Sequence, residues 1–221
     1  MLPAHPAFAP LLPWLDEGIA ALTPARLNAR AAARAEPPHS DSGASIRFVA
    51  PATRVSGAGY EGQILRSGAV PTRPGSRHDA FNAMCWIAFP RFKRACNALH
   101  VAHTVEAWPA SGMPRGPARD ALTLLDESGV IVLCADPSLS RLLIERQWKT
   151  LFWERRADVF RALRFLVCGH ALYEKLLSPY PSITARALIV PASAALLGCG
   201  PEAQRDFADE AAAGLLRSGI V

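Results

Sequence analysis

The stretch ALTLLDESGVIVLCAD, residues 121–136, gives the clearest indication of fold class in this chain. Two runs rich in Leu, Ile and Val stand on either side of ESG (127–129), a short polar segment that contains a glycine. Two such runs around a Gly-containing turn are typical of a β-hairpin, and Pro137 then ends the pattern. We therefore expect a central β-hairpin at about residues 121–136.

The segments around the predicted hairpin have mainly helical patterns. Asp79 can cap a helix that is interrupted at Pro90 and followed by a second helix. Beyond the hairpin, an amphipathic pattern predicts a long helix over Glu154–Leu177. Short strands fit residues 46–50 and 186–190, each of which is followed by a proline. The sequence thus predicts an α+β fold, a helix-dominated single domain with a central β-hairpin and one or two further short strands.

The composition excludes several classes of protein. Half of the 221 residues are hydrophobic and 19% are charged, which argues against a globally disordered chain. No apolar run reaches the roughly 18–20 residues needed to cross a bilayer. The segment Met1–Leu15 lacks both the basic residue and the unbroken apolar core of a signal peptide. The five cysteines form no CxxC pair, so we interpret them as buried thiols in a reducing compartment. We expect a soluble, cytoplasmic protein with no membrane partner.

The excess of basic residues is concentrated in one part of the chain. The whole sequence has 24 basic and 19 acidic residues, a net charge of +5. Residues 61–119 alone hold eight basic and three acidic residues, which is also a balance of +5. A solvated basic face explains this segment more simply than phosphate contacts do, so a nucleic-acid partner is not favoured.

The same basic segment contains the first group of candidate site residues. His78, Asp79 and Asn82 fall near one face of the first predicted helix, and Lys93 and Asn97 share a stripe of the next. Imidazole, amide and ammonium groups gathered in this way suit a pocket for a phosphate or a carboxylate. We favour a structural interpretation, in which Asp79 caps its helix and the pair His100 and His103 on the next helix lies at the surface or an interface.

Two further polar groups interrupt apolar segments. Arg119 and Asp120 stand at the entrance to the predicted hairpin, where a carboxylate is disfavoured unless it is paired. We therefore weigh a structural ion pair above catalysis for Asp120. His170 and Glu174 are four residues apart in the predicted helix, so they can form a pair that fixes the imidazole tautomer. Gly169 before them indicates close packing against another backbone, or a break that presents His170.

Two other motifs are interpreted as structural. Asp126 and Glu127 have side chains that are typical of a hairpin tip. Trp148, Phe152 and Trp153, with cationic residues between them, could stack on single-stranded nucleic acid. Burial of these rings in the core, with the cationic groups at its rim, is the simpler interpretation and the one we favour.

Four segments, YEGQILRSGAVPTR, HDAFNAMCWIAFPRFKRACNALH, RDALTLLDESGVIVL and GHALYEKLLSPY, resemble the motifs of a bacterial, mainly proteobacterial, family of unknown function. The resemblance covers roughly residues 46–190. It implies a cytoplasmic, single-domain bacterial protein and indicates no mechanism. It divides the chain into an N-terminal helical and loop segment (1–45), a core domain (46–190) and a C-terminal helical tail packed on the same domain (191–221).

These observations lead to one hypothesis and two alternatives. The hypothesis is a small hydrolase-like enzyme for a phosphate-bearing or otherwise anionic substrate. In it His170, oriented by Glu174, is the general base. The alternatives are a nucleic-acid- or protein-binding module that uses residues 66–119, and a structural polar network without catalysis. The sequence assigns no metal, cofactor or oligomeric state. The predicted catalytic residues are His78, Asp79, Asp120, His170 and Glu174, and the predicted substrate-binding residues are Asn82, Lys93, Asn97 and Arg119.

Overall fold

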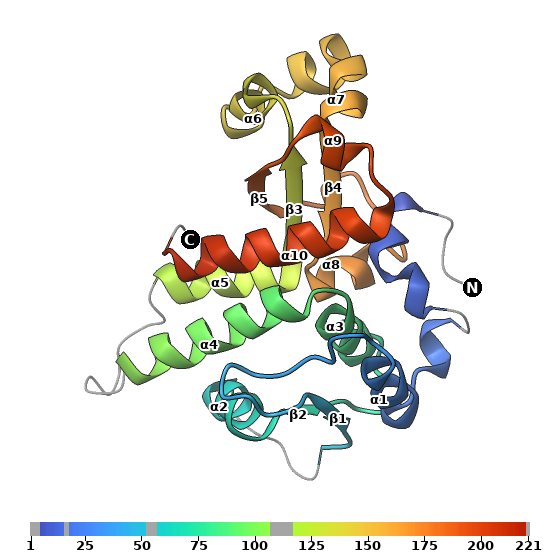
Figure 1. The fold of residues 1–221 in the computed structure, drawn as a ribbon, viewed down its shortest axis with the longest axis vertical. Helices are drawn as coiled ribbons and strands as arrows, with labels where there is room; N and C mark the ends of the chain where they lie inside the picture. The colour runs from blue at the N-terminus through green and yellow to red at the C-terminus, as the bar shows by residue number, and fades with distance from the viewer. Residues whose placement is uncertain (1–4, 16–17, 52–56, 107–116, 220–221) are drawn as a thin grey trace.

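The computed structural model describes residues 5–15, 18–51, 57–106 and 117–219. In these residues helices dominate, and five short strands form two small sheets (Figure 1). None of the described helices is long and apolar enough to span a membrane. The helices are η1 (Pro6–Trp14), η2 (Ile19–Ala21), α1 (Pro24–Ala32), α2 (Gly57–Ser67), α3 (Arg77–Ala88), α4 (Pro90–Glu106), α5 (Pro117–Ser128), α6 (Pro137–Ile144), the π-helical turn η3 (Thr150–Glu154), α7 (Arg156–Ala162), α8 (His170–Lys175), α9 (Ala194–Leu197) and α10 (Pro201–Arg217). The strands are β1 (Arg47–Val49), β2 (Ala69–Pro71), β3 (Gly129–Cys134), β4 (Leu163–Val167) and β5 (Arg186–Pro191).

The larger sheet has three strands with β3 in the middle. β3 runs antiparallel to β4 and parallel to β5. The smaller sheet consists of β1 and β2, which run parallel to each other. The short strands expected at residues 46–50 and 186–190 are present as β1 and β5. The prediction of a helix-dominated α+β domain is confirmed.

The predicted β-hairpin at residues 121–136 is wrong. Its first run belongs to the helix α5, and only Gly129–Cys134 forms a strand, whose antiparallel partner is the distant β4. The residue types explain the difference. ALTLLD is rich in Ala and Leu, which favour helices, whereas the β-branched residues are confined to VIV (130–132). Leu122 and Leu125, three residues apart, form the buried face of α5.

The predicted helix over Glu154–Leu177 is also wrong, because a strand interrupts it. α7 ends at Ala162, β4 follows directly, and α8 begins at His170. Pairing with β3 satisfies the backbone hydrogen-bonding groups of β4. A short apolar run does not reveal by periodicity alone whether it is a strand or a piece of helix, so the sequence pattern could not separate the two.

Gly169 lies where the chain leaves the sheet and enters α8. Its N–H and that of Cys168 both donate to the carbonyl oxygen of Gly129, each at 3.0 Å. A Cβ atom at position 169 would lie 2.2 Å from the backbone nitrogen of Gly129. Close backbone packing and a break directly before His170, the two alternatives expected for this glycine, are therefore both present.

The helix α3 is the centre of the main hydrophobic core. Every residue from Asp79 to Ala88 is buried, and α1, α4, α8 and η1 pack around the helix. Because α3 is enclosed in this way, its polar residues Asp79 and Asn82 are buried together with Lys93 of α4. The core therefore encloses charged and polar groups that require partners.

A second, smaller core supports a projecting module formed by α6, η3 and α7 (137–162). Leu139, Leu151 and Val159 of this module pack with Val132 and Leu163 of the sheet. Figure 1 shows α6 and α7 at one end of the long axis of the molecule, with β1 and β2 at the other end. The projecting module is therefore far from the small sheet and has apolar packing of its own.

The prediction that Trp148, Phe152 and Trp153 are core residues is wrong. Their exposed fractions are 51%, 43% and 76%. Aliphatic residues fill the second core instead, and the rings lie on the outside of the projecting module.

The contact between Gly129 and Gly169 leads to a first prediction. The change Gly169→Ala places a methyl group against backbone atoms, so we expect it to lower the free energy of unfolding by about 3 kcal/mol. Gly214→Ala is the matched control, because Gly214 lies inside α10 with no atom within 4 Å of an added Cβ. We expect this control to raise the stability by about 0.5–1 kcal/mol. Urea denaturation measures both, and equal effects of the two changes would contradict the close approach.

Candidate functional site

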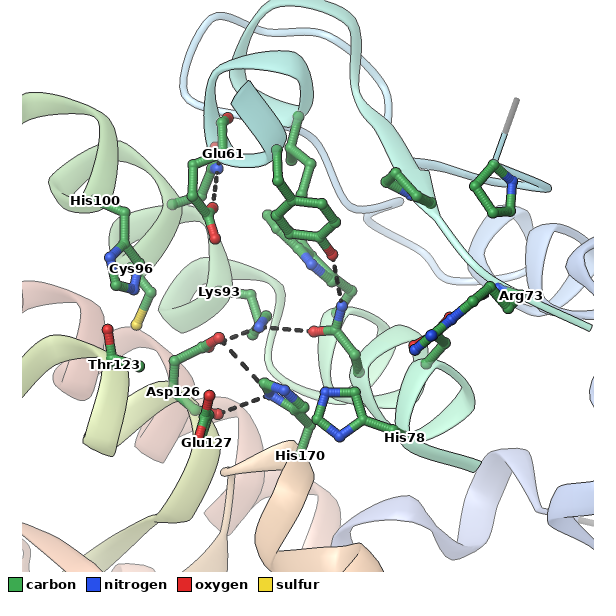
Figure 2. Close-up of a pocket in the computed structure, with 18 of the residues that line it drawn as sticks. Glu61, Arg73, His78, Lys93, Cys96, His100, Thr123, Asp126, Glu127 and His170 are labelled. Atoms are coloured by element: carbon green, nitrogen blue, oxygen red, sulfur yellow. Dashed lines mark hydrogen bonds and ion pairs between the residues drawn. The ribbon is translucent and has the colours of Figure 1, made fainter. Parts of the chain in front are cut away.

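A cavity of about 650 Å³ lies between α2, α3, α4, α5 and α8 (Figure 2). Each of these helices contributes polar or charged side chains to its lining. A cavity of this volume is in the range that accommodates small molecules. Because the five helices come from distant parts of the sequence, the site depends on the tertiary fold.

The lining of the cavity includes a buried ion pair. Lys93 is only 4% exposed, and its Nζ donates to Oδ1 of Asp126 at 2.6 Å and to Oδ1 of Asn82 at 2.9 Å. The Asn82 amide donates in turn to the Tyr60 hydroxyl at 3.0 Å. The ring of Trp86 has its centroid 5.6 Å from Nζ. A carboxylate, an amide oxygen and an aromatic ring therefore surround the ammonium group in the place of water.

Both members of this pair are charged. Burial alone would lower the pKa of Lys93, but the adjacent Asp126 carboxylate raises it above its ordinary value. Burial would likewise raise the pKa of Asp126, but Lys93, and then His170, hold it below its ordinary value. Removal of either partner would leave the other as an unpaired buried charge.

His170 lies beside the ion pair and is oriented by it. Its Nδ1 is 2.9 Å from the carbonyl oxygen of Asp126 and 3.7 Å from Oδ2 of the same residue. A carbonyl oxygen only accepts hydrogen bonds, so Nδ1 carries the proton and Nε2 carries the lone pair. Burial lowers the pKa of His170 to about 4, and the ring is therefore neutral at pH 7. The His78 ring stands edge-on to it, with 4.7 Å between the centroids.

Glu61 of α2 is a second group whose pKa is strongly shifted. Burial raises the pKa of its carboxyl to about 7, and the negative charge of Asp126 adds to the shift. The Asn97 amide donates to Oε2 of Glu61 at 2.6 Å and to its backbone oxygen at 3.0 Å. This carboxyl therefore exchanges its proton near neutral pH, well above the range of roughly pH 4 in which carboxyls ordinarily titrate.

Of the two remaining cationic side chains in the cavity, Arg73 is paired with a carboxylate of the described residues and Arg119 is not. The backbone N–H and Nε of Arg73 donate to Oδ2 of Asp79 at 2.8 and 2.7 Å, so this guanidinium is paired. Arg119 of α5 lines the cavity, and its charge acts on Glu61, but it forms no ion pair within the described residues. In that part of the chain no group of three or more His, Cys, Asp or Glu side chains is arranged to hold a metal ion.

The fold brings together most of the residues that the sequence singled out. Asp120 and Glu174 do not line the cavity. Asp120 is exposed in the first turn of α5, where a negative charge complements the helix dipole, so its expected place at the start of a strand is wrong. Glu174 contacts Nδ1 of His78 at 3.4 Å, whereas His170 is oriented by Asp126. The predicted residues that do line the cavity are His78, Asp79, Asn82, Lys93, Asn97, Arg119 and His170.

Sequence reasoning missed Asp126 and Glu61. Asp126 was assigned to a hairpin tip, because the run before it was taken for a strand. A helical period would have revealed it, since Arg119, Thr123 and Asp126 recur at intervals of four and three, on a face of α5 next to that of the buried leucines. For Glu61 the sequence offers no comparable signal, because its shifted pKa arises from burial against α4.

Comparison with known proteins adds a family and no function. Residues 46–220 match the model of a family described as "Protein of unknown function (DUF3025)". No curated protein and no solved structure matches the chain. The matched segment contains all the helices that line the cavity.

The buried ion pair yields a prediction for stability. We expect Lys93→Met to lower the free energy of unfolding by about 3–5 kcal/mol, because it leaves the Asp126 carboxylate buried without its cation. Asp126→Asn removes the other charge. In a double-mutant cycle measured by urea denaturation, the combined variant should lose at least about 1 kcal/mol less than the sum of the single changes. Strictly additive losses would contradict a direct interaction.

Glu61 yields a prediction for the dependence of stability on pH. Its carboxyl has a pKa of about 7 when folded and an ordinary value of 4.5, so between these values the folded state binds more protons than the unfolded state. Stability from this residue is therefore lost as the pH rises from 4.5 through 7. The variant Glu61→Gln cannot ionise, so its stability relative to the wild type should rise by about 3 kcal/mol across this range. A difference that stays constant between pH 4.5 and pH 8, in urea melts of the two proteins, would refute the shift.

Proposed function

The chain belongs to DUF3025, a family whose function is unknown, and we propose that it is an enzyme that hydrolyses a small anionic substrate in the cavity. The observation that carries this proposal is the contact of His170 with Asp126, which fixes one tautomer of a neutral imidazole at the cavity wall. A hydrogen bond that sets the tautomer through one ring nitrogen and leaves the other as an acceptor is the arrangement of a histidine general base. The roles of the other residues follow from their protonation states.

His170 has the properties of a general base. Its proton on Nδ1 is held by the Asp126 carbonyl, so Nε2 is free to accept a proton from a water molecule. When it does so, the positive charge that forms on the ring is stabilised by the Asp126 carboxylate at 3.7 Å. Because the pKa of His170 is about 4, the lone pair is available throughout the neutral pH range. Its removal of a proton from water generates the nucleophile.

Water is a better candidate nucleophile than the side chains nearby. Burial raises the pKa of the Cys96 thiol well above its ordinary value, so this residue stays a protonated thiol of low reactivity. The Thr123 hydroxyl donates to the backbone oxygen of Arg119 within its own helix. Neither group is activated, whereas a water beside His170 would be.

Glu61 has the complementary properties of a general acid. With a pKa of about 7, a large fraction of its carboxyl is protonated at neutral pH and can donate to the oxygen of a leaving group. The environments of His170 and Glu61 push their pKa values in opposite directions, one favouring the neutral base and the other the neutral acid. Such a division is a recurring feature of sites that combine acid and base catalysis.

Arg119 is the candidate partner for the negative charge of the substrate. Lys93 and Arg73, the other cations of the lining, are matched by Asp126 and Asp79. We therefore assign Lys93 a role in organising the site, in place of the substrate-binding role expected from the sequence. A guanidinium can bind a phosphate or a carboxylate through two parallel hydrogen bonds.

A binding module that uses residues 66–119 has less support. In the described part of this segment, Arg91 contacts Glu36 at 2.5 Å and Glu210 at 2.9 Å. With Arg73 and Lys93 also paired, much of the local positive charge is balanced within the protein. Paired cations contribute less to contacts with phosphate groups, and the described residues of this segment expose no large aromatic side chain on which a base could stack.

The proposed roles predict a bell-shaped dependence of kcat/KM on pH. The rate should rise as His170 loses its proton near pH 4 and fall as Glu61 loses its proton near pH 7. Suitable substrates are p-nitrophenyl phosphate, bis(p-nitrophenyl) phosphate and a p-nitrophenyl ester that carries a carboxylate. We expect His170→Asn to lower kcat by about 10²–10⁴ and Glu61→Gln to remove the alkaline limb with a lower maximum.

Asp120→Asn is the matched control for these variants. It changes an exposed charge on α5 outside the cavity, so its rate should stay within a factor of about two of the wild type. Circular dichroism melts establish that each variant is folded. The proposal fails if no substrate of the panel is turned over, or if His170→Asn and the wild type turn over a substrate at equal rates.

A further inference from the structure

The projecting module and the adjacent strand β4 together carry most of the large apolar side chains that the described chain exposes. Six of the ten exposed large hydrophobic residues in the described part of the chain lie between residues 144 and 165. Five of the six are aromatic, and we call them the aromatic face: Trp148, Phe152, Trp153, Phe160 and Phe165. The proposed active site does not use them, because none lines the cavity.

The large aliphatic residues of this module are buried or half-buried, except Ile144, which is 71% exposed, whereas the large aromatic residues are exposed. Leu139, Leu151 and Leu163 are at most 3% exposed and fill the second core. Trp153 and Phe160, in contrast, are 76% and 67% exposed. A surface that only needed to be apolar could use leucine as well as phenylalanine. The placement of rings on the outside therefore points to a ligand that has flat π faces of its own.

The rings stand next to one another. The centroids of Trp148 and Phe152 are 6.2 Å apart with 15° between their planes, and Phe152 lies 6.3 Å from Phe165. Two uncommon backbone conformations precede or contain these residues: Arg146 has a φ of 57°, and η3 is a π-helical turn. A positive φ is unfavourable for a residue other than glycine, and a π-helical turn is rare. Both conformations occur often at functional sites.

The module and the first residues of β4 also carry a local excess of positive charge. Residues 137–165 contain seven basic and three acidic residues, a balance of 7 − 3 = +4. Four of the seven basic residues form ion pairs, namely Arg141, Lys149, Arg155 and Arg161. Within the described residues the other three, Arg146, Arg156 and Arg164, form none, so the excess charge rests on them. Arg156 is exposed, and its guanidinium lies 5.3 Å from the centroid of the Phe160 ring. Cationic groups therefore stand directly beside the exposed rings.

We propose that the aromatic face binds single-stranded nucleic acid, with bases stacked on its rings and phosphates beside its arginines. Exposed rings combined with cations are the two elements that proteins use to bind single strands without reading their sequence. The nearly parallel rings of Trp148 and Phe152 favour this ligand, because bases stack on flat ring faces. A lipid surface, which also accepts Trp and Phe beside cations, is the competing ligand in the test. The face lies on η3, α7, β4 and the segment between α6 and η3, and none of its residues lines the cavity, so this binding is independent of the cavity.

The test is a binding titration followed by fluorescence anisotropy. The probe is a fluorescein-labelled oligothymidylate of about 20 nucleotides, longer than the usual site of a single-strand binder. We expect binding that weakens linearly with the logarithm of the salt concentration. Trp153→Ala and Phe160→Ala should each weaken it about tenfold, and Trp153→Phe should restore most of the loss because it keeps a ring. Arg156→Gln should reduce the salt slope by about 0.7.

Tyr180→Ala is the matched control, because Tyr180 is a 49% exposed aromatic residue outside the module. This variant should bind like the wild type. A labelled duplex should bind more weakly than the single strand, because its bases are already stacked. Anionic phosphatidylglycerol vesicles test the competing ligand by co-sedimentation. The proposal is overturned if the protein does not bind the oligonucleotide, or if Trp153→Ala binds it as tightly as the wild type. It is also overturned if Trp153→Ala and Phe160→Ala lose vesicle binding while their oligonucleotide binding is unchanged.

Discussion

The ammonium group of Lys93 lies inside the protein, opposite the carboxylate of Asp126, and this buried ion pair constrains both the core and the site. Two charges out of water are tolerated only where each finds close partners. α3 supplies the amide of Asn82, α5 supplies the carboxylate, and α8 supplies the imidazole beside it. Together with α4, which carries Lys93, four helices therefore meet at this ion pair. Displacement of any of them would leave a buried charge without one of its partners.

A contact between two glycines brings the histidine to this point. Gly129 begins β3 three residues after Asp126, and Gly169 directly precedes His170. The hydrogen bond between their backbones, at 3.0 Å, aligns the end of α5 with the start of α8. With no Cβ atom between them, the chains come close enough for His170 Nδ1 to reach the Asp126 carbonyl. Backbone packing and site chemistry are thus parts of one arrangement.

The sequence predicted the helical character of the fold and seven of the nineteen residues that line the cavity, but not the arrangement of the site. His78, Asn82 and Lys93 were recognised because polar groups of unusual type recur along two helices. Asp126 was missed because a Leu-rich helix was interpreted as a strand, and this also assigned the wrong partner to His170. Such partnerships depend on contacts between distant segments, which local periodicity does not encode. The exposure of Trp153 was missed for the same reason, because burial depends on what the fold places over a residue.

The central claim is that Asp126 holds His170 as a neutral imidazole with its proton on Nδ1. The most direct measurement is an NMR titration of protein labelled with ¹⁵N in its histidine rings, with His170 assigned by comparison with His170→Asn. The account predicts an Nδ1–H tautomer that stays neutral on acidification and takes up a proton only near pH 4. A ring that titrates near its ordinary pKa of 6.5, or that carries its proton on Nε2 at neutral pH, would contradict it.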